Sequence, residues 1–132
     1  MKICINTNIF FDLILKREHH KEALKIFNAI SNHLFTGVIL DITILNIDYI
    51  AKKQIKDIRD FLNLINDTFI IIGVNNKSIS KALKISNNDL EDNLQYICAN
   101  ENKCDAIITN DKNFYNGNIE TMSSTMFLKR FF

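Results

Sequence analysis

The sequence predicts a three-layer α/β/α sandwich with a central, mainly parallel sheet. Short apolar segments alternate with amphipathic helical segments along the chain, the pattern of parallel strands joined by crossover helices. No internal repeat or Pro/Gly-rich linker interrupts this alternation, and proline is absent. The length of 132 residues is that of one domain, since chains divide at roughly 100–200 residues per domain. We therefore expect a single domain over residues 1–132.

The predicted strands are short, apolar and bounded by polar residues. The run at 69–73 is apolar throughout, which predicts a strand covered on both faces. Ile119 is expected to start a last short strand after the turn dipeptide Asn116-Gly117. The other expected strands are 2–6, 34–40 and 106–109.

The predicted helices carry apolar side chains at spacings of three and four residues. In the segment 21–30, for example, Ala23, Leu24, Phe27 and Ile30 form one apolar stripe. Asp41 and Asp89 stand where N-caps are expected, because a carboxylate there accepts the free N–H groups of a first turn. The expected helices are 9–16, 21–30, 44–51, 55–65, 78–85, 89–100 and 123–132.

Composition excludes several classes of function. Sixteen Lys and Arg against fifteen Asp and Glu give a formal net charge of +1, so no bulk positive field drives DNA binding. The three glycines are far apart, which excludes a Gly-rich phosphate loop. The three cysteines lack zinc-site spacing and are expected to be buried, reduced thiols of a cytoplasmic protein. No apolar run approaches the ~20 residues that a membrane-spanning helix needs.

Polar side chains fall at the ends of the predicted strands. Asn6 ends the first strand, Asp111 follows the strand at 106–109, and the helix at 89–100 begins with Asp89 and Asp92. In an open α/β sheet ligands bind outside the carboxyl ends of the strands. Two carboxylates about 4 Å apart repel by about 4 kcal/mol at an effective dielectric near 20, so a cluster there favours a divalent cation. Oxygen ligands without His or Cys favour Mg²⁺ or Mn²⁺.

Simpler interpretations of these acids remain open. Asp41, Asp89 and Asp111 are also expected as helix or turn caps. Glu91 is expected to be solvated. Asp12 lies in an apolar helix, where a partly buried carboxylate with its own partner is as good an explanation as a ligand.

Three segments carry a family resemblance. Residues 3–13 read Ile-Cys-Ile-Asn-Thr-Asn-Ile-Phe-Phe-Asp-Leu, which resembles the opening of PIN domains, where a strand runs into Asp-Thr-Asn and a second Asp follows. Residues 89–96, Asp-Leu-Glu-Asp-Asn-Leu-Gln-Tyr, are similar to the family's Asp-x-x-Asp-Ala-Leu-Gln segment. Residues 106–114 resemble its strand followed by Thr-Arg-Asn/Asp-x-x-Asp-Phe. Order and spacing match along nearly the whole chain, so residues 1–132 look like a single PIN-like domain.

The resemblance implies a metal-dependent ribonuclease, commonly the toxin of a VapC-type toxin–antitoxin pair, with Mg²⁺ or Mn²⁺ bound at the carboxyl edge of a parallel sheet. It implies RNA as substrate and, as protein partners, a small antitoxin and a second copy of the chain. Asp92, Asp111, Asp89 and Asn6 match the catalytic and metal-binding positions, and Asp12, Asn46 and Thr109 match supporting positions.

Two matched positions depart from the family pattern. Asn6 stands where an Asp is expected, and Asn46 where a Glu is common. Asparagine offers a neutral oxygen that neither neutralises a cation nor acts as a general base. Two functions therefore remain open: a ribonuclease of reduced activity, or a catalytically degenerate PIN domain that binds RNA or a partner protein. A response-regulator receiver, a third α/β fold with an acidic edge, lacks the lysine it needs after the last strand.

Two further surface features are ambiguous in the sequence. Basic residues at Lys16-Arg17 and in the segment 52–59 either follow an RNA backbone or form ordinary solvated helix faces. The apolar end of the chain, 126–132, is expected to pack within the domain, with an exposed interface as the alternative.

Overall fold

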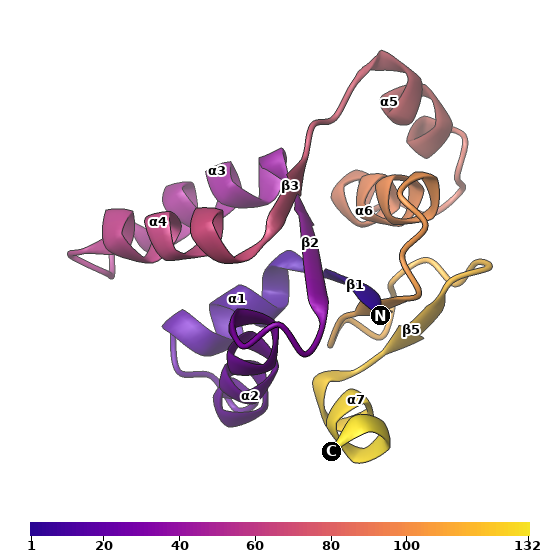
Figure 1. The fold of residues 1–132 in the computed structure, drawn as a ribbon. Helices are drawn as coiled ribbons and strands as arrows, with labels where there is room; N and C mark the ends of the chain where they lie inside the picture. Colours follow the sequence, from indigo (N-terminus) through magenta and orange to yellow (C-terminus); the bar gives the residue numbers. More distant parts are fainter.

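A computed structural model describes all of residues 1–132 and confirms the predicted α/β class. Five strands form one sheet in which every neighbouring pair is parallel. The order across the sheet is β3-β2-β1-β4-β5 (Figure 1). The strands are β1 (Lys2–Ile5), β2 (Thr36–Leu40), β3 (Ile70–Ile72), β4 (Ala106–Ile108) and β5 (Glu120–Met122).

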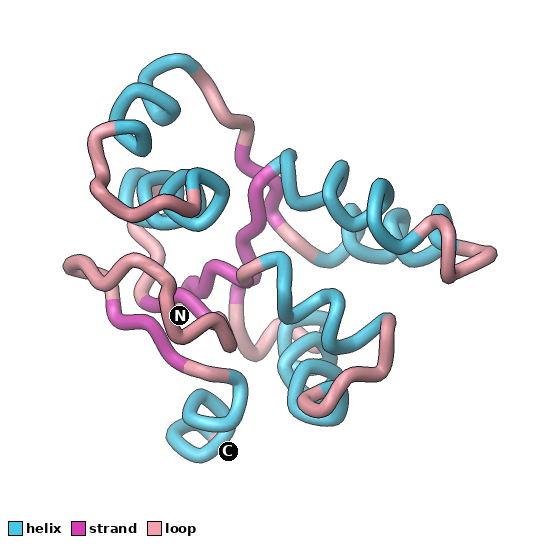
Figure 2. Tube along the Cα trace, turned by 180° about the vertical axis from the view of Figure 1, so that it is seen from behind, coloured by secondary structure: helices cyan, strands magenta, loops and turns pink.

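Seven helices surround the sheet (Figure 2). Helices α1, α2 and α7 pack on one face, and the pair α5–α6 covers the other. Helices α3 and α4 form an arm that extends sideways from the sheet (Figures 1 and 2). The bounds are α1 (Thr7–Ile14), α2 (His20–Ser31), α3 (Asp41–Ala51), α4 (Ile58–Thr68), α5 (Asn76–Leu83), α6 (Leu90–Glu101) and α7 (Ser124–Phe131). None of these helices has the length and apolar character that a membrane crossing requires.

The alternation of side chains along the strands divides the core in two. Ile3 and Ile5 of β1 enter the larger cluster beneath α1 and α2, whereas Cys4 between them enters the smaller cluster beneath α6. Phe127 of α7 is fully buried and its ring lies 5.1 Å from that of Phe35, so this part of the chain end packs within the domain, as expected. Met126 and Phe132 of the same segment remain 52% and 64% exposed. All three cysteines are buried and unpaired, also as predicted.

Two local expectations are wrong. The run at 69–73 does not form a two-sided buried strand: β3 is an edge strand, and Ile70 is 51% exposed. Leu40, not Asp41, occupies the N-cap position of α3. Asp41 still serves the helix start, since its carboxylate accepts the N–H groups of Ile42 at 2.8 Å and Val74 at 3.3 Å.

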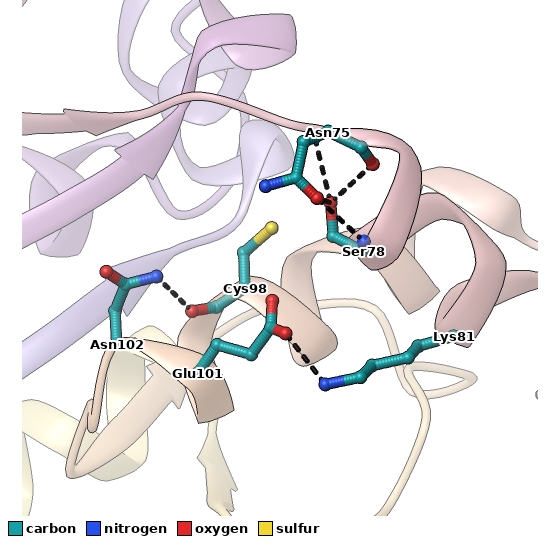
Figure 3. Close-up of polar contacts among 6 residues, drawn as sticks. All are labelled: Asn75, Ser78, Lys81, Cys98, Glu101 and Asn102. Atoms are coloured by element: carbon teal, nitrogen blue, oxygen red, sulfur yellow. Dashed lines mark hydrogen bonds and ion pairs between the residues drawn. The ribbon is translucent and has the colours of Figure 1, made fainter.

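An ion pair joins helix α5 to α6, and hydrogen bonds within each helix stabilise the start of α5 and the end of α6 (Figure 3). Asn75 and Ser78 form a capping box that satisfies N–H groups at the start of α5. Lys81 of α5 pairs with Glu101 of α6 at 2.8 Å, a half-exposed ion pair worth less than about 1 kcal/mol. The pair of helices is thereby held over the sheet, with the start of α6 at the carboxyl edge.

The strand order creates a topological switch point beside β1. The chain leaves β1 through α1 and α2 to reach β2 on one side, whereas β4 lies on the other side and is reached through α5 and α6. The connections after β1 and β4 therefore diverge and leave a crevice between the carboxyl ends of these strands, which is where open α/β sheets bind ligands. Asn6 and Thr109 are the first residues beyond the two strands.

Candidate metal centre

Three carboxylates converge at this crevice. Asp89, Asp92 and Asp111 each direct one oxygen into a group whose members all lie within 4.8 Å of one another. Asp89 and Asp92 come from the start of α6, and Asp111 from the segment after β4. We call these three residues the acidic cluster. The structure thus brings together the acids that the sequence placed at separate strand and helix ends.

Local hydrogen bonds fix two of the three acids. Asp89 is the N-cap of α6, and its Oδ1 accepts the N–H of Asp92 at 3.1 Å, so its second oxygen is free to face the cluster. Asp111 accepts the N–H of Asn113 at 2.9 Å and donates its own N–H to the hydroxyl of Thr109 at 3.1 Å. The capping roles predicted for Asp89 and Asp111 therefore coexist with membership of the cluster.

Asp92 is the buried member of the cluster, with a 6% exposed side chain. Its Oδ1 accepts a hydrogen bond from the amide of Asn6 at 3.2 Å, whereas its Oδ2 is buried with no donor at all. Burial is the largest cause that raises the pKa of Asp92 to about 7, followed by a hydrogen bond that the protonated carboxyl donates to Asp111 and by the negative charge of Asp89. The hydrogen bond from the Asn6 amide lowers the pKa of Asp92 and so opposes these effects.

These features fit a divalent cation. A buried carboxylate oxygen without a donor costs about 1–3 kcal/mol or more in lost hydration, and a cation removes that cost. The cluster contains only oxygen ligands, the set that hard cations such as Mg²⁺ and Mn²⁺ prefer. No lysine or arginine side chain makes an ion pair with any member of the cluster. Its charge is therefore not neutralised by the protein.

Asn6 lies beside the cluster and bridges two elements. Its Oδ1 accepts the N–H of Asn8 at 2.9 Å and so caps α1, while its Nδ2 donates to Asp92. The side chain of Asn6 is 3% exposed. The amide thus meets the acidic cluster through its nitrogen.

The supporting positions predicted from the sequence lie around this centre. Asp12 is 8% exposed and accepts the amide of Asn110 at 2.9 Å, so it has its own partner and lies outside the cluster. Asn110 also contacts Ser124 at the start of α7. Thr109 is buried and accepts from Asn8 at 3.5 Å as well as from Asp111. Asp12 and Thr109 therefore hold the segment that carries Asp111.

A second polar group, which we call the Thr7 network, adjoins the acidic cluster. Glu91, expected to be solvated, is instead half-buried: it accepts two hydrogen bonds from Asn46, at 2.8 and 3.0 Å, and one from Thr7 at 3.0 Å. The Thr7 hydroxyl also contacts the buried side chains of Thr43 and Gln95, each at 3.2 Å. The network comprises Thr7, Thr43, Asn46, Glu91 and Gln95.

Sequence reasoning missed Thr7, Thr43 and Gln95. One signal was available on α6, where Glu91 and Gln95 are four residues apart and share a helix face. The position of Thr43 across from Thr7 depends on how α3 packs against α1, which no local pattern reveals.

A cavity of about 250 Å³ opens beside Asp111. It lies between the segment after β4 and the end of β5, and its lining is mostly polar. Lys112 is the one basic side chain in this lining. The lining residues are Thr109, Asn110, Asp111, Lys112, Phe114, Asn116, Thr121, Met122 and Ser123.

Comparisons with known proteins agree with this architecture. Ribonuclease VapC1 of Aquifex aeolicus is 26% identical over 140 residues, covering 98% of this chain and 94% of that protein. A toxin–antitoxin complex from Klebsiella pneumoniae contains a chain with a TM-score of 0.69 and 22% identity, covering 92% of this chain and 97% of that one. A chain in the structure of VapBC2 from Rickettsia felis, bound to a DNA fragment from its promoter, has a TM-score of 0.64 and 19% identity. The match covers 93% of this chain and 98% of that one.

The family model described as PIN domain matches residues 2–113, which include β1 to β4 and the acidic cluster. The resemblance seen in three sequence segments is confirmed over this range. The chain belongs to the PIN domain family.

Proposed function

We propose that the protein is a ribonuclease of the PIN type that depends on Mg²⁺ or Mn²⁺ and serves as the toxin of a toxin–antitoxin pair in the cytoplasm. One observation carries the proposal: three carboxylates converge at the switch point of a parallel sheet, and the most buried of them has an oxygen with no donor. The similarity to a protein named Ribonuclease VapC1 supports the RNA substrate.

The acidic cluster would hold the cation through Asp89, Asp92 and Asp111. A bound divalent cation supplies two effects, a lower pKa for a coordinated water and polarisation of a phosphoryl oxygen. The chain's own contribution is to fix the three oxygens: the α6 cap orients Asp89, and the turn after Thr109 orients Asp111. Asn6 keeps Asp92 in place.

The cavity beside Asp111 would receive part of the RNA. At about 250 Å³ it is slightly smaller than the ~300–1,000 Å³ typical of pockets for drug-sized ligands, which suits a single nucleotide unit. Lys112 lies in its lining, where it would attract a phosphate. Lys52, Lys53 and Lys56 are exposed at the tip of the α3–α4 arm and would contact a longer RNA.

The protein partner that we propose is an antitoxin. Leu45 and Tyr49, four residues apart on α3, are each 69% exposed, and Ile50 beside them is 44% exposed. Exposed apolar side chains gathered on one element mark an interaction surface. Both structural neighbours come from toxin–antitoxin complexes, which favours an antitoxin there. A second copy of the chain is the other partner; light scattering of the isolated protein tests for this homodimer.

The alternative function is a degenerate PIN domain that binds RNA or a partner protein without cleavage. Asn6 and Asn46 favour it, because both stand where the family commonly carries an acid and neither brings charge. The two functions differ in whether the acidic cluster still binds a cation.

Cleavage of a labelled single-stranded RNA in Mn²⁺, in Mg²⁺ and in EDTA tests the proposal. We expect cleavage that needs the cation and is lost in Asp92→Ala, while Asp48→Ala, a change on the arm outside both polar groups, retains it. Equal activity in wild type and Asp92→Ala would refute the assignment. RNA binding without cleavage, and no change in thermal midpoint in millimolar Mn²⁺, would establish the alternative.

A further inference from the structure

The orientation of the Asn6 side chain is fixed by its neighbours. The N–H of Asn8, 2.9 Å away, requires an acceptor, so the amide oxygen of Asn6 must face it. The amide nitrogen then faces Oδ1 of Asp92 at 3.2 Å. Turning the amide over would place a donor against the Asn8 N–H and an oxygen against a carboxylate, and would lose both hydrogen bonds. Asn6 is 3% exposed, so water offers no substitute.

The two oxygens of Asp92 consequently differ. Oδ1 is engaged by Asn6, and Oδ2 is buried without a donor. One oxygen of Asp92 lies within 4.8 Å of oxygens from Asp89 and Asp111. The nitrogen that Asn6 presents to Asp92 has no lone pair to give to a cation, whereas Oδ2 has.

We propose that Asn6 is a positioning residue: it donates to Oδ1 of Asp92 and leaves Oδ2 as the oxygen that Asp92 offers to a divalent cation. Asn6 thus acts on the cation through Asp92, which replaces the ligand role that the sequence resemblance implies for it. The part that concerns the cation rests on the proposed function, whereas the hydrogen bond exists in the metal-free protein.

This arrangement has a consequence for charge. The cation site contains the three formal negative charges of Asp89, Asp92 and Asp111, and an Asp at position 6 would add a fourth directly against Asp92. In the metal-free protein that fourth carboxylate would repel Asp92, whereas with a cation it would strengthen binding, because affinity for hard cations rises with the number of charged ligands.

Exchange of the two side chains tests the hydrogen bond without reference to nuclease activity. In EDTA at pH 8 we expect Asn6→Asp to lower the thermal midpoint by about 5 °C or more. The double variant Asn6→Asp with Asp92→Asn again places one amide against one carboxylate, so the change at position 6 should no longer destabilise the protein. The thermal midpoint of the double variant should therefore lie within about 2 °C of that of the single variant Asp92→Asn. Asn6→Ser retains a good helix cap but cannot reach Asp92, and it isolates the cap from the contact.

Two measurements extend the test to the cation. Titration with Mn²⁺ should show at least ~10-fold tighter binding to Asn6→Asp than to wild type. In wild type, the side-chain amide signals of Asn6 in ¹H–¹⁵N NMR should keep their hydrogen-bonded shift when Mg²⁺ saturates the site. This second measurement needs no variant, so it applies even where Asn6→Asp fails to fold.

Three results would overturn the inference. They are an unchanged midpoint for metal-free Asn6→Asp, a double variant as unstable as that single variant, and loss of the Asn6 amide hydrogen bond when Mg²⁺ binds. If the exchange behaves as expected but RNA is not cleaved, the positioning role stands and the ribonuclease function falls.

Discussion

The acidic cluster and the Thr7 network lie side by side at the same edge of the sheet, yet they differ in how many hydrogen-bond donors face their carboxylates. In the network, the carboxylate of Glu91 accepts three hydrogen bonds from neutral donors, and only Oε1 of Gln95 lacks a partner. In the cluster, three carboxylates face one another, and Oδ2 of Asp92 is buried with no donor.

The difference separates a structural polar group from a binding site. The network satisfies its one charge with amides and hydroxyls, so it stabilises the contact of α1, α3 and α6 without a ligand. The cluster brings three such acids together with one donor for each, and Oδ2 of the buried Asp92 has none. Burial, a hydrogen bond that the protonated carboxyl donates to Asp111, and the nearby negative charge of Asp89 raise the pKa of Asp92 to about 7. Proximity of acids alone does not identify a cation site; the missing donors do.

The largest effect expected is loss of cation binding when the cluster is neutralised. In Asp111→Asn the Mn²⁺-dependent rise in thermal midpoint should disappear, and RNA cleavage should fall by more than ~100-fold, since even the partners of metal ligands cost 10–100-fold. Differential scanning fluorimetry with and without Mn²⁺ measures the first effect. Glu91→Gln in the adjoining network is the matched control, and its thermal midpoint should still rise with Mn²⁺. If the midpoint of Asp111→Asn also rises with Mn²⁺, the acidic cluster is not the cation site.

The second effect concerns stability, and it belongs to the network. Thr7→Val preserves shape but removes the hydroxyl that contacts Glu91, Thr43 and Gln95. Leaving a buried polar group unpaired costs about 1–3 kcal/mol, so the free energy of unfolding in urea should fall by about 2 kcal/mol. Thr68→Val makes the same change at an exposed hydroxyl of α4 and should cost much less. Equal losses in the two variants would mean that the network contributes nothing.

A smaller effect on stability and on Mn²⁺ affinity is expected from changes that loosen the segment that carries Asp111. The hydroxyl of Tyr96 accepts the N–H of Asn118 at 2.8 Å and so anchors this segment to α6. Tyr96→Phe should cost about 1 kcal/mol of stability and weaken Mn²⁺ binding a few-fold, as measured by urea unfolding and by titration. Tyr115→Phe is the matched control, because its ring packs against Tyr96 while its hydroxyl makes no hydrogen bond. Identical Mn²⁺ affinity in all three proteins would show that the anchor does not reach the cluster.

The smallest effect comes from thiols buried among apolar side chains. Burial raises the pKa of Cys98 and of Cys104 to about 11, and that of Cys4 still higher. The folded protein holds these protons more tightly than the unfolded chain, so stability is fully present below about pH 9 and falls as the pH rises towards about 11. A disulfide reagent at pH 8 should label the thiols only in denaturant. Rapid labelling of the native protein would contradict their burial.

The strand ends and the acids were predictable because both follow from local patterns. Alternation of apolar runs and helical stripes placed β1 and β4, and the rule that parallel strands share a carboxyl edge placed Asp92 and Asp111 together. The family segments agreed with that placement. Their roles in binding a cation stay predictions for the experiments above.

The remainder was not predictable because it depends on which side chains meet across distant elements. The exposure of Ile70 follows from the position of β3 at the sheet edge, and an apolar run looks the same in an edge or a central strand. The burial of Glu91 depends on Asn46 of α3, far away in sequence. The direction of the Asn6 amide depends on two partners, of which only Asn8 is local.

The parallel sheet also has a practical consequence for experiments. Because every strand runs the same way, Met1 lies at the amino edge where β1 begins, and α7 leads from the end of β5 back towards Phe35 at that edge (Figure 1). A purification tag or a surface linker joined at residue 1 or 132 therefore leaves on the side away from the crevice. Immobilised protein should bind cations and oligonucleotides as the free protein does, which makes sensor-chip titration a suitable format.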